Sequence, residues 1–237
     1  MLSFVATPIG NLRDITLRAL DVLKDADLIL CEDTRRTQTL LERYEIKKPL
    51  MSHHEHSGPG RIEQVLRELE SGRKVAVVSD GGMPLVSDPG FELLREVLRK
   101  GIPMEVLPGP CACVTALAAS GLATDSFTFY GFLPPKSAAR KKELSRLAGR
   151  EETLIFYESP FRLLKALGDM KETLGDREAV VARELTKKFE EIIRGNLSAL
   201  IAKFSKGKIL GEIVVLVSGK DRKKILTAPG DAGEKNG

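Results

Sequence analysis

The sequence predicts an α/β protein with a largely parallel sheet in its first half. Apolar runs alternate with helical patterns over residues 1–116, the order that joins parallel strands through helices. Residues 75–79 (V-A-V-V-S) form a short apolar run, as expected of a strand covered on both faces. Just before it, apolar residues recur at helical spacing between positions 62 and 69, and Gly72 follows where such a helix would end. A helix that leads into a buried strand is therefore the repeating unit.

The remaining elements follow from the same patterns. Strands are predicted at residues 27–31, 75–79, 102–107, 127–132, 153–157, 178–183, 190–194 and 212–217. Helices are predicted at residues 34–44, 62–72, 91–99, 136–150 and 159–174. Ser159 and Pro160 suit the N-cap and the first position of the last of these helices. We expect the strand at 190–194 to pair with the strand at 212–217.

The composition and its change along the chain predict two domains. With 237 residues, of which 42% are apolar, the chain can fill the cores of one large domain or two small ones. After the small-residue stretch at 116–121 (A-L-A-A-S-G), aromatic and β-prone residues begin. We expect α/β domains at residues 1–116 and 117–219 with a hinge near 116–126, and a disordered polar tail at 220–237.

Charge and cysteine content narrow the class of protein. No apolar run reaches the roughly 18 residues of a membrane span, and no signal-peptide layout opens the chain, so a cytoplasmic location is expected. Cys31, Cys111 and Cys113 form no C-x-x-C pair and are interpreted as small apolar fillers. The net charge of +4 is modest, but residues 136–150 hold six basic residues and one acidic residue. This segment suits either a solvated helix face or docking on RNA phosphates.

Loops rich in Gly and Pro follow several predicted strands. They are T-P-I-G-N at residues 7–11, the long segment at 79–90, L-P-G-P-C-A-C at 107–113 and Y-E-S-P at 157–160. In open α/β sheets, ligands bind beyond the carboxyl ends of the strands, where backbone amides are accessible. No dinucleotide or NTP fingerprint is present, so binding by backbone groups and apolar walls is expected. Asp80 is the best polar contact there, although it also suits an Asx turn.

These loops, together with other segments, resemble a known family. The motifs are T-P-I-G-N-L-R-D-I-T-L-R-A-L, C-E-D-T-R-R-T, S-H-H-E-H, V-S-D-G-G-M-P-L-V-S-D-P-G, P-G-P with A-L-A-A-S-G-L, G-F-L-P, Y-E-S-P and A-R-E-L-T-K. In this order they resemble the small-subunit ribosomal RNA methyltransferases of the tetrapyrrole-methylase class. The resemblance covers residues 5–217 and is specific because many motifs occur together.

The resemblance implies a fold, a cofactor and a substrate. It implies a two-domain enzyme that binds S-adenosylmethionine in a cleft between the domains, the first domain contributing the substrate site and part of the cofactor site. It also implies a homodimer that methylates the ribose 2′-oxygen of a decoding-region cytidine in 16S rRNA, with neither DNA nor a membrane as partner. The implied cofactor contacts are Pro8, Asp80, Met83, Val86, Pro108, Cys111, Ala112, Tyr157 and Ala182.

A ribose hydroxyl needs a proton acceptor, because it is a poor nucleophile. Our first candidates are Glu32 and Asp33 in C-E-D-T-R-R-T, with Arg35 or Arg36 binding a phosphate or ribose. In an alternative interpretation, Asp33 or Thr34 only caps the next helix and the arginines are solvated.

Further candidates for proton transfer are His54 and Glu184. In an extended segment His54 would share a face with His56, and an imidazole near its usual pKa accepts protons at neutral pH. The H-H-E-H spacing does not match a zinc motif, so no metal is expected. Glu184 suits either catalysis or an exposed ion-pair patch, and Glu158 suits either a cofactor contact or a position before a helix cap.

Two other functions remain open at this point. One is a methylase of the same class that acts on a tetrapyrrole or a protein side chain. The other is an rRNA-binding assembly factor without catalytic activity. The basic segment at 136–150 and the C-E-D-T-R motif favour RNA as the substrate.

Overall fold

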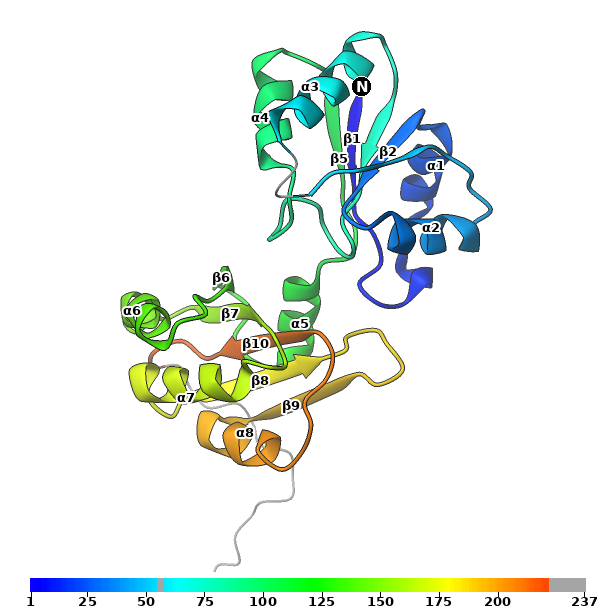
Figure 1. The fold of residues 1–237 in the computed structure, drawn as a ribbon. Helices are drawn as coiled ribbons and strands as arrows, with labels where there is room; N and C mark the ends of the chain where they lie inside the picture. Colours follow the sequence, from blue (N-terminus) through cyan, green and yellow to red (C-terminus); the bar gives the residue numbers. More distant parts are fainter. Residues whose placement is uncertain (55–57, 222–237) are drawn as a thin grey trace, which may run out of the picture. The chain divides into compact units, whose positions relative to one another are not determined.

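The computed structural model describes residues 1–54 and 58–221 and contains two compact α/β units (Figure 1). The first unit consists of Met1–Ala112 together with Thr186–Lys188, and the second of Cys113–Leu185 with Phe189–Gly237. Most of the predicted tail, from residue 222 on, lies outside the described residues, as do positions 55–57. Within the described ranges, no helix combines the length and the apolarity that a membrane crossing requires.

A five-stranded parallel sheet forms the centre of the first unit. Its largely parallel character was predicted, but its strands at residues 2–5 and 50–52 were not. Its order is β3-β2-β4-β1-β5. The strands are β1 (Leu2–Val5), β2 (Leu28–Cys31), β3 (Leu50–Ser52), β4 (Val75–Val77) and β5 (Met104–Leu107), and the helices are η1 (Leu12–Asp14), α1 (Leu17–Asp25), α2 (Thr34–Arg43), α3 (Pro59–Glu70) and α4 (Phe91–Arg99).

Helices cover both faces of this sheet, as Figure 1 shows. Apolar residues of α1 and α2 pack with Val5 on one face, whereas those of α3 and α4 pack with Leu2 and Phe4 on the other. Because side chains alternate along a strand, β1 contributes to both cores and is buried along its whole length, with Ser3 donating a hydrogen bond to Glu105 Oε1 at 2.9 Å. Burial on both faces explains why β2 and β4 were recognisable as apolar runs.

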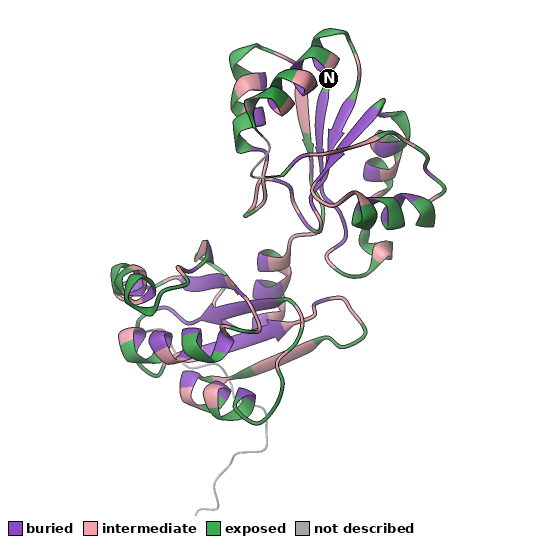
Figure 2. Cartoon of the chain, in the orientation of Figure 1, coloured by how far each residue is buried: buried purple, intermediate pink, exposed green. Residues whose placement is uncertain are grey.

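The second unit is built on a mixed sheet of order β6-β7-β10-β8-β9, in which β6 and β7 are parallel and the other pairs antiparallel. Its strands are β6 (Phe127–Phe132), β7 (Thr153–Glu158), β8 (Glu178–Arg183), β9 (Glu191–Asn196) and β10 (Ile213–Val217), and its helices are α5 (Ala112–Ser120), α6 (Ser137–Leu147), α7 (Leu163–Leu174) and α8 (Leu197–Phe204). Figure 2 shows the central strands as buried, and their side chains form one apolar core with α6, α7 and α8.

Three details of the second unit differ from the sequence-based predictions. The strand β9 pairs with β8 and not with β10, because β10 already has β7 and β8 as its two neighbours. The helix α7 has Arg162 as its N-cap residue, and Ser159 instead accepts a hydrogen bond from Phe161 N in the preceding turn. The segment predicted as a hinge at 116–126 is helical up to Ser120, where Arg194 donates to the Ser120 carbonyl at 2.8 Å.

The basic helix α6 carries fewer solvated charges than its sequence indicates. Arg140 is only 2% exposed and pairs with Asp169 of α7 at 2.7 Å. Its guanidinium also donates to the carbonyls of Pro134 and Pro135. Arg140 is therefore a structural residue of the second core and fits neither the solvated face nor the RNA-docking face that the sequence left open for this segment. Lys136 and Lys142 of this segment are exposed.

The buried pair predicts a large effect of removing one partner. We expect Asp169→Ala to lower the free energy of unfolding by about 3–5 kcal/mol, because Arg140 would be left buried without its counterion. Urea unfolding would measure the change. Glu172→Ala is the matched control, since this carboxylate pairs with Lys141 on the exposed face of the same helix. Equal stability of the two variants would contradict the structural role of Arg140.

Candidate active site

The carboxyl ends of β2 and β4 bring two of the predicted motifs together. Asp33 N donates a hydrogen bond to Asp80 Oδ1 at 3.0 Å, and Asp80 N lies 3.4 Å from Glu32 Oε1, which accepts from it. Arg36 Nε lies 3.6 Å from Asp80 Oδ2. These contacts join C-E-D-T-R to the loop after β4, which the sequence placed 47 residues apart.

Asp33 has a local structural task in this cluster. It is the N-cap of α2, and its Oδ1 accepts a hydrogen bond from Arg35 N at 2.8 Å. The Arg35 side chain is 94% exposed. Because the cap already uses the Asp33 carboxylate, Glu32 is the better candidate for a proton acceptor.

Three carboxyl groups influence one another at this edge of the sheet. Burial raises the pKa of Glu32, and the negative charge of Asp80 adds to the effect. Burial also raises the pKa of Asp88 to about 7, with a further contribution from Glu32, against a hydrogen bond from Ser79 that lowers it. Asp88 therefore gains and loses its proton close to pH 7. A general base is most effective when its pKa lies near the working pH, so the cluster suits proton transfer.

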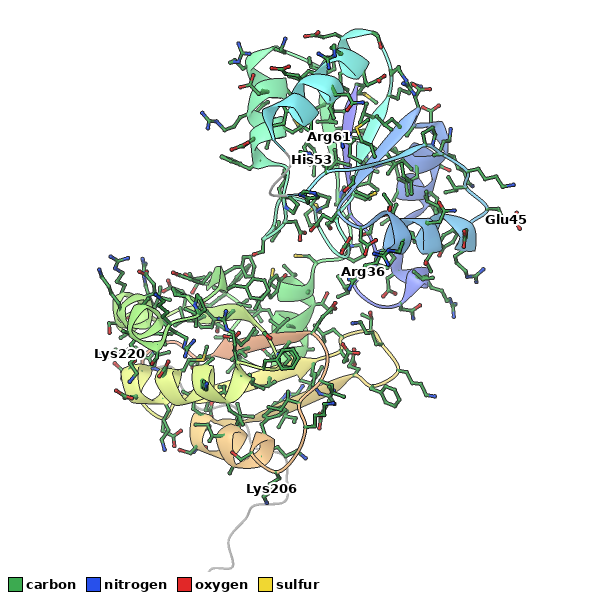
Figure 3. The ribbon with its side chains drawn as sticks, in the orientation of Figure 1. Arg36, Glu45, His53, Arg61, Lys206 and Lys220 are labelled. Atoms are coloured by element: carbon green, nitrogen blue, oxygen red, sulfur yellow. The ribbon has the colours of Figure 1, made fainter. Side chains whose placement is uncertain are left out.

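A hollow of about 650 Å³ opens beside these carboxyl groups. We name it the His53 pocket, and it is lined by Glu32, His53, His54, Ile62 and residues 87–92. His53, labelled in Figure 3, is buried, and burial lowers the pKa of its imidazole. His54, the histidine chosen from the sequence, lines the same pocket but is exposed. His56 lies outside the described residues.

The Gly- and Pro-rich loops of the first unit approach one another closely. Thr7 and Gly82 exchange two backbone hydrogen bonds of 2.9 Å, which fix the loop after β1 against the loop after β4. A Cβ atom on Gly81 would lie 3.2 Å from Pro8 O, and one on Gly109 would lie 2.7 Å from Ala6 Cβ. Glycine at these positions therefore allows backbone to approach backbone.

Comparison with known proteins places this chain in a family. The family described as Tetrapyrrole (Corrin/Porphyrin) Methylases matches residues 1–201. This chain belongs to that family. The proteins named ribosomal RNA small subunit methyltransferase I from Thermotoga maritima and Bacillus subtilis are 50% and 47% identical to it. The first alignment covers 93% of this chain and 99% of that protein, and the second 95% and 77%.

Solved structures of tetrapyrrole methylases share the fold. The cobalamin biosynthetic enzyme cobalt precorrin-4 methyltransferase has a TM-score of 0.69 at 19% identity, covering 92% of this chain and 94% of that one. Uroporphyrin-III-C-methyltransferase from Thermus thermophilus has a TM-score of 0.62 at 23% identity, covering 91% and 93%. At these identities the likeness concerns the fold, and it agrees with the predicted class.

The cofactor contacts implied for this tetrapyrrole methylase divide between the two units. The first unit contains Pro8, Asp80, Met83, Val86, Pro108, Cys111 and Ala112. In the second unit, Tyr157 is half-buried, and its ring contacts those of Phe129 and Phe132 at 4.9 and 5.7 Å. Ala182 has no exposed surface and lies between β9 and β10. In this conformation, Ala182 offers no surface to a ligand.

The remaining acidic candidates make structural contacts in the second unit. Glu184 has a positive φ of 54°, and its carboxylate accepts a hydrogen bond from Glu212 N at 2.9 Å. Glu158 is 3% exposed, lies 3.0 Å from Arg162 Nε and accepts a hydrogen bond from Ser159 N. Across the described part of the chain, no group of three His, Cys, Asp or Glu side chains is arranged to hold a metal ion.

Sequence reasoning missed His53 and Asp88. Asp88 lies within a loop that the sequence singled out, but its raised pKa comes first from burial and then from the charge of Glu32, which follows a different strand. His53 lies next to the histidine that was chosen, and only its burial distinguishes the two. Neither the raised pKa of Asp88 nor the burial of His53 can be predicted from the residues next to it in the sequence.

The raised pKa of Asp88 predicts a pH-dependent stability. Because the folded protein binds this proton more tightly than the unfolded chain does, the contribution of Asp88 to stability falls as pH rises from about 4 to about 7. Asp88→Asn removes that decline, so the variant should gain thermal stability relative to the parent protein between pH 4 and pH 8. Melting temperatures across this range would test the expectation.

Asp21→Asn, on the exposed side of α1, is the matched control and should keep the parent profile. Parallel profiles for the parent and Asp88→Asn would show that Asp88 ionises as an ordinary carboxylate.

Proposed function

We propose that this protein is an S-adenosylmethionine-dependent methyltransferase that modifies a cytidine of small-subunit (16S) rRNA at its ribose 2′-oxygen, in the decoding region. The observation that carries the proposal is the 50% identity to the Thermotoga maritima rRNA methyltransferase over 99% of that protein. The acidic cluster at the ends of β2 and β4 adds the proton acceptor that this chemistry needs.

The first unit has the features that suit the cofactor. S-adenosylmethionine supplies a methyl group activated by its sulfonium sulfur. Gly81 and Gly109 keep Cβ atoms out of the space between the loops, so backbone amides and carbonyls can reach a ligand. Asp80 is partly exposed, and a carboxylate can accept hydrogen bonds from hydroxyl or ammonium groups. Cys111 and Ala112 are small, partly exposed residues at the start of α5.

Glu32 is the residue that we assign to proton transfer. Glu32 would accept the ribose hydroxyl proton, while the methyl group would pass to the ribose oxygen and leave the sulfonium sulfur of S-adenosylmethionine as a neutral thioether. The raised pKa of Glu32 makes it a stronger base than an ordinary glutamate. Arg35 and Arg36, whose side chains are 94% and 59% exposed, suit contacts with the phosphates on either side of the acceptor.

The cellular setting follows from the substrate. We propose that the protein acts in the cytoplasm on the small ribosomal subunit, as a homodimer, and without a membrane or DNA.

Methyl transfer tests the proposal directly. With labelled S-adenosylmethionine, we expect incorporation into unmodified small subunits at one alkali-resistant linkage in the decoding region. Asp80→Ala should reduce incorporation and weaken cofactor binding in calorimetry by about tenfold or more, because hydrogen bonds to its carboxylate are lost. Asp25→Ala is the matched control, since Asp25 pairs with Lys74 and lies in none of the predicted site loops.

Other outcomes would change the assignment. Cofactor binding without transfer to RNA would indicate a tetrapyrrole or protein acceptor. Absence of cofactor binding would favour an assembly factor. Unchanged affinity in Asp80→Ala would remove Asp80 from the cofactor site.

The exposed lysines of the segment around α6, Lys136 and Lys142, give a separate prediction about RNA binding. We expect the double variant Lys136→Glu and Lys142→Glu to bind small subunits more weakly and with a reduced salt dependence, by about one unit of slope per lost phosphate contact. Lys100→Glu, on the first unit and outside this segment, is the control. An unchanged slope would assign α6 to the ordinary surface.

A further inference from the structure

The His53 pocket is not explained by the proposed cofactor contacts. None of the residues implied to touch S-adenosylmethionine lines it, although all of them belong to the described part of the chain. The pocket belongs entirely to the first unit. Its volume of about 650 Å³ falls in the range of small-molecule sites, roughly 300–1,000 Å³. It therefore has room for a ligand other than the cofactor.

His53 indicates that this ligand is polar. The residue is 6% exposed, and its Nδ1 atom has no hydrogen-bond partner among the described residues. A buried polar atom without a partner is costly, and a ligand in the pocket would supply one. Because burial lowers the pKa of His53, the imidazole is neutral at pH 7 and can donate or accept according to its tautomer.

The carboxyl groups of the pocket disfavour a phosphate as its occupant. Glu32, Asp88 and Glu92 all line it, and a phosphate among these carboxyl groups would be repelled. A nucleobase with an exocyclic amine is complementary, because its N–H groups donate to carboxyl oxygens. Arg61 is close enough to lower the pKa of His53 and provides a positive charge for a phosphate next to the base (Figure 3).

Phe91 supplies a surface for the face of such a base. It is the first residue of α4, lines the pocket and is 65% exposed. Exposed aromatic rings bind unpaired bases by stacking. Ile62, which is 8% exposed, adds an apolar contact from α3.

We propose that the His53 pocket binds the unpaired, flipped-out base of the acceptor nucleotide, an amino-bearing pyrimidine that stacks on Phe91 and hydrogen-bonds to His53 and Asp88. This inference rests on the proposed function, since it assigns the pocket to the same acceptor. Removing the base from its stack would bring its ribose beside Glu32, which lines the pocket as well. The adenine of the cofactor also carries an exocyclic amine. The experiment must therefore distinguish binding of the acceptor base from binding of the cofactor's adenine.

Direct binding of cytidine 5′-monophosphate is the first test, with the full-length protein saturated with S-adenosylmethionine. We expect a saturable shift of the His53 imidazole resonances, assigned with His53→Gln. Uridine 5′-monophosphate should bind more weakly, because O4 replaces the amine. Phe91→Ala should weaken cytidine monophosphate binding roughly tenfold or more, the scale of one stacking contact. Leu98→Ala, on α4 but outside the pocket, is the control.

Competition between the two ligands would overturn the proposal. If the mononucleotide binds the cofactor-free protein and added S-adenosylmethionine displaces it, the pocket belongs to the cofactor. Absence of a saturable shift, or equal binding by Phe91→Ala, would also overturn it.

Methyl transfer kinetics on small subunits give the second test. Phe91→Ala should lower kcat/KM about tenfold, with cofactor affinity by calorimetry unchanged. Phe91→Leu keeps an apolar side chain and separates a folding defect from a loss of stacking, and it should retain the melting temperature but not the rate. Parent-like rates in both variants would overturn the proposal. If the parent protein transfers no methyl group to RNA, the proposed function fails, whereas the mononucleotide titration still decides what the pocket binds.

Discussion

The parallel pairing of β4 with β1 on one side and with β2 on the other is the constraint on which the candidate site depends. In a parallel sheet the carboxyl ends of neighbouring strands meet at one edge, so the loops after β1, β2 and β4 must meet there as well. The Thr7–Gly82 bridge and the Asp33–Asp80 hydrogen bond are the local consequences. A register shift of one residue in β4 would turn its side chains to the opposite face and separate these groups.

This arrangement gathers negative charge where water is partly excluded. Burial raises the pKa of Glu32 and of Asp88, and the negative charges of Asp80 and Glu32 add to these shifts. A fold that only needed stability would gain from replacing Glu32 or Asp88, since ionising a carboxyl group in a partly buried place is unfavourable. Their presence is better explained by chemistry that uses a proton near neutral pH.

Much of the fold was predictable because its signals are local. Continuous apolar runs such as residues 75–77 indicated the parallel strands, and the spacing in α4 gave that helix its observed bounds. The pairing of β9 was not predictable, because the antiparallel neighbours of β8 and β10 depend on the whole sheet. Arg140 looked like a surface charge for a similar reason, since its partner Asp169 lies on another helix. His53 and Asp88 escaped prediction because burial and charge neighbours are tertiary properties.

The distribution of charge agrees with a division of labour in binding RNA. Phosphates are attracted by exposed basic groups, here Arg35 and Arg36 in the first unit and Lys136 and Lys142 in the second, and such contacts carry no sequence information. A pocket lined by carboxyl groups repels phosphates and accepts only the part of a nucleotide that donates hydrogen bonds. Because the two kinds of surface favour different parts of a nucleotide, the proposed binding mode would place the base inside the pocket and the phosphates outside it. Glu32 also lines the pocket, so the proposed proton acceptor and the proposed base site share one cavity.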